Sequence, residues 1–249
     1  MLDVSFILPT VRPYNEFAGI VVDTTKQFMD KSPYTYEILI YTQHEVPNIE
    51  NVTRLEEKER TGGPVKGYNE SFKESKGKYI FVLNDKWNTN TKILKAIPFL
   101  ESDDFKNRKF KVTSINVVKD FSYDADTDMP IKGSTRETHV ALTPELLHPR
   151  FLEPRHKYRI FGFPVFDRET VLNHLGGYLL HPGFISHYHD NWLSFYIGEQ
   201  GEFPLLCIDT YMDIFDGYLP SLCQSDEHDF QVFCKLTTDL INGKNLNYV

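Results

Sequence analysis

The sequence has few of the features that mark secreted, membrane-spanning or nucleic-acid-binding proteins. Its three cysteines, Cys207, Cys223 and Cys234, are an odd number at wide spacing, which excludes a disulfide framework and a Cys-x-x-Cys zinc site. Its longest apolar runs, such as residues 79–83, are far too short to cross a bilayer. The 27 Lys and Arg against 35 Asp and Glu leave a formal net charge of −8, which argues against a general polyanion binder.

The start of the chain also lacks a basic stretch followed by an apolar one. We therefore expect no signal peptide, no transmembrane segment and a cytoplasmic location. What the chain does have is a folded protein's composition, with 41% hydrophobic residues, 19 Phe and 14 Tyr. This is enough to bury a full core, which excludes wholesale disorder, and no linker interrupts residues 1–249. We expect one domain.

The first half alternates strand-like and helix-like stretches. Short apolar runs predict strands at residues 4–8, 36–41 and 78–83, and helical spacing of apolar residues predicts helices at 15–30, 65–75 and 89–100. This alternation is typical of a parallel α/β sheet, in which ligands bind at the carboxyl ends of the strands. The polar residues directly after the predicted strands are therefore the first candidates for a binding site.

The second half is less regular. We predict a strand at residues 111–119, a loop or flap at 121–136, a short apolar segment at 161–166, and helices at 167–175, 191–198 and 226–241. The mixed-charge run at 54–60 indicates a solvated helix face.

Two blocks of sequence combine small and polar residues in a recurring order. In the first, Gly62-Gly63 is followed by Asn69, Ser71, Ser75 and Gly77, then by a strand and the turn Asn84-Asp85-Lys86. In the second, Gly176-Gly177-Tyr178 precedes His189-Asp190-Asn191-Trp192. Together, in this order, the blocks resemble the family 2 glycosyltransferases of the GT-A fold, and Asn84 stands where that family's Asp-x-Asp begins.

The resemblance implies a GT-A-like α/β fold with a mixed, mainly parallel sheet flanked by helices. It implies an inverting glycosyltransferase of polysaccharide biosynthesis, which moves a sugar from a nucleotide-diphosphate sugar to a hydroxyl of a glycan or lipid-linked acceptor. Residues of about 1–100 would bind the donor, about 101–215 the acceptor, and 216–249 would form a helical tail. Nucleic acid is not an expected partner, and peripheral association with a membrane stays open.

The family's metal-binding Asp-x-Asp is replaced here by Asn84-Asp85-Lys86, and three interpretations stay open. Asp85 would hold Mn²⁺ or Mg²⁺ with water and phosphate oxygens. Alternatively, the Lys86 ammonium would take over the metal's charge at the diphosphate. In the third interpretation the three residues form an ordinary polar turn.

Polar residues at the predicted strand ends, together with the family resemblance, predict a nucleotide-sugar site. The amide of Gln43 would hydrogen-bond the base, and Arg12 and Lys66 would meet phosphates. The full set is Thr10, Arg12, Gln43, Lys66, Asn69, Asn84, Asp85 and Lys86.

On the acceptor side, Asp190 is the candidate catalytic base, because it opens a helix at the family's spacing from Gly176-Gly177. Its alternative is an ordinary helix N-cap. We expect Trp87, His189 and Trp192 to contact the acceptor. His181, His187 and His189 lie close in sequence and, as a group, would suit a transition metal; scattered surface and supporting roles are the simpler interpretation.

Two other functions remain from the sequence. A sugar-phosphate nucleotidyltransferase would want a Gly- and Lys-rich loop after the first strand, where this chain has Pro9-Thr10-Val11-Arg12-Pro13. A non-catalytic relative that binds a nucleotide or glycan would explain the altered metal motif, and Asp190 speaks against it.

Overall fold

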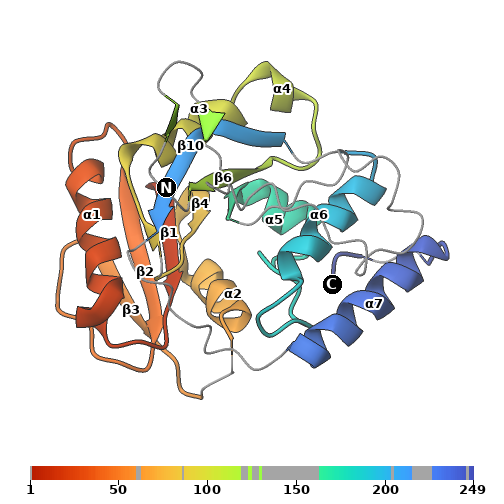
Figure 1. The fold of residues 1–249 in the computed structure, drawn as a ribbon, viewed down its shortest axis with the longest axis horizontal. Helices are drawn as coiled ribbons and strands as arrows, with labels where there is room; N and C mark the ends of the chain where they lie inside the picture. Colours follow the sequence, from red (N-terminus) through yellow and green to blue (C-terminus); the bar gives the residue numbers. More distant parts are fainter. Residues whose placement is uncertain are drawn as a thin grey trace.

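The computed structural model describes residues 2–59, 63–85, 87–118, 123–124, 129–130, 163–202, 205–214, 226–244 and 247–249. Within this part, one eight-stranded sheet has the strand order β3-β2-β1-β4-β9-β6-β10-β5 (Figure 1). Its strands are β1 (Leu2–Pro9), β2 (Tyr36–Thr42), β3 (Val52–Glu56), β4 (Gly77–Val82), β5 (Trp87–Asn88), β6 (Val112–Val118), β9 (Pro164–Asp167) and β10 (Leu205–Ile214).

The sheet is mixed and mainly parallel, as predicted. Strands β3, β2, β1 and β4 run parallel to one another, and so do β6 and β10. Strand β9 lies antiparallel between β4 and β6, and the short β5 pairs antiparallel with β10 at one edge. Because β9 joins the two parallel groups, strands from both halves of the chain form a single sheet.

Helices cover both faces of the sheet. They are α1 (Gly19–Met29), α2 (Val65–Glu74), α3 (Ala96–Leu100), α4 (Asp103–Lys106), α5 (Arg168–His174), α6 (His189–Glu199) and α7 (Asp226–Ile241). Helices α1 and α3 pack their apolar residues on one face of the sheet, the face to which Val4, Phe6 and Leu8 of β1 contribute. Helices α2, α5 and α6 pack on the other face, and α7 lies outside α6 (Figure 1).

Most predicted elements are confirmed, with shifts of a few residues at their ends. The helix predicted at 15–30 begins with a π-helical turn, Tyr14–Ala18, before α1. The helix predicted at 89–100 is split into a 3-10 turn, Thr91–Lys95, and α3. The predicted loop at 121–136 contains the short antiparallel pair β7 (Tyr123–Asp124) and β8 (Met129–Pro130), and the rest of it lies outside the described residues.

The prediction of a solvated helix at residues 54–60 is wrong. Residues 52–56 form β3, which pairs with β2 and lies at one edge of the sheet in the described part of the chain. An edge strand keeps much of its surface in water, so charged side chains such as Arg54 and Glu56 are compatible with a strand at this position. No described helix is long and apolar enough to span a membrane.

Candidate functional site

The order of strands creates a topological switch point at the carboxyl ends of β1 and β4. From β1 the chain proceeds outward to β2 and β3, then returns to the other side of β1 to form β4. Connections therefore leave β1 and β4 in opposite directions, and in open α/β sheets ligands bind at such a point. Pro9 ends β1 and Val82 ends β4, so residues 10–12 and 83–85 lie at this switch point.

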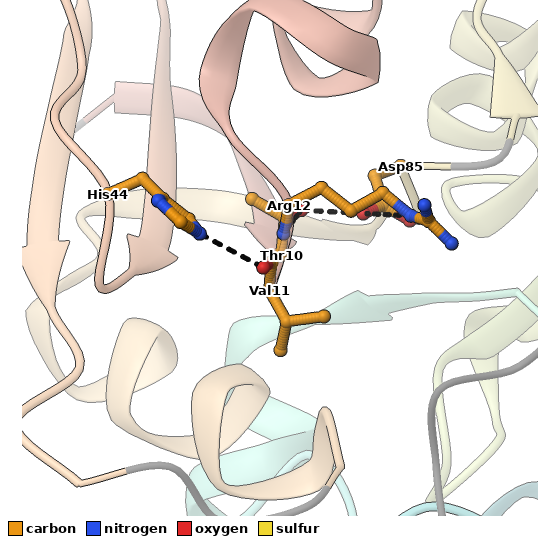
Figure 2. A network of polar contacts seen from close by, with 5 residues as sticks. All are labelled: Thr10, Val11, Arg12, His44 and Asp85. Atoms are coloured by element: carbon orange, nitrogen blue, oxygen red, sulfur yellow. Dashed lines mark hydrogen bonds and ion pairs between the residues drawn. The ribbon is translucent and has the colours of Figure 1, made fainter.

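Three predicted site residues meet here and form what we call the switch-point network, Thr10, Arg12 and Asp85 (Figure 2). The Thr10 hydroxyl donates to the Asp85 carboxylate at 2.5 Å and accepts from the Arg12 backbone N–H at 3.1 Å. The Arg12 Nε lies 3.8 Å from the same Asp85 oxygen. Thr10 and Asp85 are 75 residues apart in the chain, so the fold alone brings them together.

The Arg12 side chain is only 15% exposed, and its guanidinium lies 5.6 Å from the centre of the Phe17 ring. A cation so placed interacts more strongly with a nearby anion than an exposed lysine does, because less water screens it. The guanidinium also presents several N–H donors, which suit phosphate oxygens. The switch-point network therefore combines a carboxylate and an anion-binding group in one place.

The loop after β2 joins this edge through a residue that sequence reasoning missed. The His44 Nε2 lies 3.0 Å from the Val11 carbonyl oxygen (Figure 2). The His44 backbone N–H donates to the Thr42 hydroxyl. The Gln43 side chain is exposed, while its carbonyl oxygen accepts from Arg54. In the sequence, His44 is marked only by its position two residues after a buried strand, which is weak evidence for a role in a site.

Helix α2 approaches the same edge closely. A Cβ added to Gly67 would lie 2.7 Å from the Pro9 Cβ and 2.8 Å from the Tyr41 ring, so a larger residue there would push the helix away. Lys66, in the first turn of α2, is exposed. Gly67 thus allows close packing of α2 against the ends of β1 and β2.

Asn69 plays a structural part that differs from the expected contact with a nucleotide. Its amide nitrogen donates to the Leu180 carbonyl at 2.8 Å, and its amide oxygen accepts from the Leu180 N–H at 3.1 Å. The residue is buried. Because both ends of the amide are used by one backbone unit, we leave Asn69 out of the proposed donor site.

Asp190 lies in the first turn of α6, but it is not the helix N-cap. The N-cap position belongs to Tyr188, whose φ of 58° is in the left-handed region. One Asp190 carboxylate oxygen accepts from the Asn191 N–H at 2.8 Å, and the residue is partly exposed. A partly exposed carboxylate is the kind of group that serves as a general base.

The prediction that Trp192 contacts the acceptor is wrong. It is fully buried and packs against His181, Phe195 and Tyr196, so it belongs to the core. The apolar spacing of α6 drives Trp192 inward, whereas the neighbouring Asp190 stays at the surface. Lys86 and the side chain of Trp87 lie outside the described residues. Asn84, two residues after the end of β4, is half-buried.

The three histidines of the second block do not form a metal group. His181 accepts from the Gly183 N–H and sits among Phe184, Trp192 and Tyr248, where burial lowers its pKa to about 4. Burial also lowers the pKa of His189, against the opposing effect of Asp190. Both rings are therefore neutral near pH 7. Among the described residues, no cluster of three His, Cys, Asp or Glu side chains is arranged to bind a metal.

The sequence resemblance implies a divalent cation. At the carboxyl ends of β1 and β4 such an ion fits only together with the phosphates of a nucleotide-sugar donor. Mn²⁺ and Mg²⁺ accept one or two carboxylates when substrate phosphates complete the shell of oxygen ligands. Asp85 supplies one such carboxylate, already within reach of Thr10 and Arg12. We therefore expect weak cation binding without a nucleotide.

Comparison with known proteins places the fold. No protein-family model matches the sequence. No curated protein matches it either. The structure of S. aureus TarS 1-349 in complex with UDP-GlcNAc aligns over 99% of this chain and 68% of its own, with 14% identity and a TM-score of 0.59. GalNAc-T7 with UDP, GalNAc and Mn²⁺ aligns over 96% of this chain and 48% of its own, with 16% identity and a TM-score of 0.59.

The chain has the GT-A fold. Both of these neighbours are GT-A glycosyltransferases, as the sequence resemblance implied, and at this identity their likeness concerns the fold alone. The chain spans 41% of the longer TarS structure, so those proteins carry parts with no counterpart here.

Proposed function

We propose that this protein is a glycosyltransferase that binds a nucleotide-diphosphate sugar at the carboxyl edge of β1 and β4. The observation that carries the proposal is the switch-point network, in which Arg12 and Asp85 meet where the connections leave β1 and β4 in opposite directions. The same edge is where open α/β sheets bind nucleotides. The TarS structure in complex with UDP-GlcNAc and the GalNAc-T7 structure with UDP support this ligand class.

On the donor side, each residue of the site would have one task. Arg12 would donate to the diphosphate, in competition with Asp85, and Lys66 would add a second cation from the start of α2. Thr10 would hold Asp85 in place. Gln43, exposed after β2, would hydrogen-bond the base, and Asn84 and Lys86 would complete the phosphate side. The aromatic residue after them, Trp87, would contact the sugar or acceptor.

Asp85 would hold a Mn²⁺ or Mg²⁺ ion jointly with the donor phosphates. When bound, such an ion neutralises charge on the leaving diphosphate. In the free protein the adjacent Arg12 already balances the Asp85 charge. Cation and donor binding should therefore be coupled.

On the acceptor side, we propose Asp190 as the general base. It would take the proton of the acceptor hydroxyl as that oxygen bonds to the anomeric carbon, while the bond from that carbon to the diphosphate oxygen breaks. A single displacement of this kind inverts the anomeric centre. His189, neutral and adjacent, would contact the acceptor hydroxyl or a phosphate oxygen. The acceptor would be a glycan or lipid-linked sugar of polysaccharide synthesis, reached in the cytoplasm or at a membrane surface.

A second candidate is a non-catalytic protein that binds the same nucleotides. The observation that favours it is that Thr10 and Arg12 already engage the Asp85 carboxylate. Asp85 is the single carboxylate of the Asn84-Asp85-Lys86 turn, where the resembled family has two. Transfer or hydrolysis of the donor by the purified protein separates the two candidates.

The first experiment is thermal unfolding with UDP, GDP, CDP and dTDP, each with and without Mn²⁺. A ligand that binds only the folded state, at a hundred times its Kd, adds about 2.7 kcal/mol of stability. We expect one nucleotide to raise the Tm, and more so with Mn²⁺. Arg12→Ala should lose most of the shift, whereas Lys106→Ala, at an exposed lysine of α4, should keep it. No shift with any nucleotide would refute a donor site.

A further inference from the structure

The segment before Asp190 has no regular structure, yet part of it is buried. Residues 183–188 precede α6 as a series of turns and bends, and Phe184 and Ser186 are buried. Here the N–H groups of Ile185, Ser186 and His187 do not bond to a neighbouring strand. Buried backbone N–H groups need a partner, because leaving them unpaired disfavours folding.

One carboxylate, far away in sequence, accepts from all three. Asp229 of α7 is completely buried. One of its oxygens accepts from the Ile185 N–H at 2.8 Å, and the other accepts from Ser186 at 2.8 Å and His187 at 2.7 Å. Three short bonds from backbone N–H groups to one carboxyl group make a strong anchor for this segment.

The same segment is held from a second side. The Ile185 carbonyl accepts from the Val65 N–H of α2 at 3.2 Å, and a Cβ on Gly63 would lie 2.3 Å from that carbonyl oxygen. His228, next to Asp229, has its Nε2 3.1 Å from the Gly183 carbonyl oxygen. The segment is thus clamped between α7 and the start of α2, the helix that also borders the donor edge.

The chain passes from this clamp to Asp190 in three residues. Tyr188 adopts the left-handed conformation, its ring stacks on Phe233 of α7 at 5.7 Å, and its carbonyl accepts from the Trp192 N–H. The direction of the first turn of α6, and with it the Asp190 side chain, follows from where residues 185–187 are held.

We propose that Asp229 is the positioning residue of the active site, which fixes the backbone of residues 185–187 and thereby aims the Asp190 carboxylate at the acceptor hydroxyl. This inference rests on the proposed transferase function. It assigns to α7 a part in catalysis without contact between α7 and substrate.

The test is Asp229→Asn, which keeps size but removes the charge and turns one acceptor into an NH₂ donor facing backbone N–H groups. We expect at least a tenfold fall in the kcat of transfer, with the Kd of the nucleotide unchanged within about twofold. Amide hydrogen exchange should quicken in residues 183–190 and not in β1 or β4. The matched control is Asp239→Asn on the same helix, whose carboxylate pairs only with Lys244 among the described residues and should leave all three readings unchanged.

Wild-type kcat in a folded Asp229→Asn protein would overturn the proposal, and so would a joint loss of nucleotide binding and transfer, which a merely structural role predicts. If Asp229→Asn does not fold, His228→Ala takes its place, with the same split between kcat and Kd expected at a twofold to fivefold level. Wild-type kcat there would count against the clamp. If the wild-type protein transfers no sugar from any donor, the proposed function fails, and amide exchange alone then decides whether Asp229 holds residues 183–190.

Discussion

The two sides of the candidate site are built in different ways. On the donor side, Thr10, Arg12 and Asp85 follow regular strands and contact one another through their side chains. On the acceptor side, residues 180–187 are irregular, and the buried side chains of Asn69 and Asp229 bind their backbone. The sheet ladder positions the first group, whereas two distant polar residues replace the ladder for the second.

This difference predicts how substitutions on each side should affect ligand binding and the fold. A change on the donor side should weaken a ligand contact and leave the fold intact, because the strands beneath it are held by their own ladder. A change at Asn69 or Asp229 leaves buried backbone groups unpaired, so it should alter the geometry of a whole segment. The following predictions test this contrast.

Asp190→Asn should have the largest effect, since it removes the proposed base while its amide oxygen can still accept from the Asn191 N–H. We expect transfer to fall by roughly 10²- to 10⁴-fold, the usual contribution of a positioned base, with nucleotide affinity and Tm close to wild type. Steady-state transfer assays and nucleotide titration measure both quantities. Glu199→Gln at the far end of α6 is the control. Full activity of Asp190→Asn would remove Asp190 from the mechanism.

Asn69→Ala should reduce the free energy of unfolding by roughly 2 to 4 kcal/mol, because the buried N–H and C=O of Leu180 lose their partners. Chemical denaturation gives this value directly. Glu70→Ala, at the next and exposed position, should change stability by about 0.5 kcal/mol or less, since its pair with Lys73 is at the surface. Equal losses in the two variants would contradict the structural role of Asn69.

His181 should make the protein lose stability in acid. Its folded pKa of about 4 lies below the ordinary 6.5, so the unfolded state binds more protons between these values. Its contribution is complete above pH 6.5 and declines as the pH falls through about 4. We expect a loss of roughly 2 kcal/mol, allowing for its partial exposure.

The variant His181→Asn can still accept from the Gly183 N–H but does not titrate there. Denaturation at a series of pH values should show a flatter curve for the variant between pH 4 and 6.5. Parallel curves for the two proteins would assign the acid loss to other groups.

Removal of divalent cations should have the smallest effect of the four. With chelator, wild-type affinity for the preferred nucleotide should fall about tenfold, which is 1.4 kcal/mol. Asp85→Asn should bind the nucleotide equally with and without Mn²⁺. A Mn²⁺ effect that persists in Asp85→Asn would move the metal away from Asp85, and no effect in wild type would favour Arg12 or Lys86 as the charge that replaces it.

The local sequence pattern predicted much of the structure of the N-terminal half, where we propose that the donor binds. Short apolar runs that end in polar residues predicted β1, β2 and β4, and with them the positions of Thr10, Gln43 and Asp85 at one edge. The pattern failed at β3, because charges on an edge strand look like those on a solvated helix. It also failed to separate Asn69 and Trp192 from ligand contacts, since a polar or aromatic residue at a family position has the same spacing whether it faces solvent or the core.

The sequence by itself determined the α/β class, the main strands and helices, and the candidate residues at strand ends and at the start of α6, because apolar periodicity and strand-end polarity are local properties. Only the tertiary structure decided which of these meet. Thr10 and Asp85 are 75 residues apart, and Asp229 is 42 to 44 residues from the N–H groups that it binds. Such pairings depend on strand order and on which buried backbone groups lack a partner, and both arise only when the whole chain is packed.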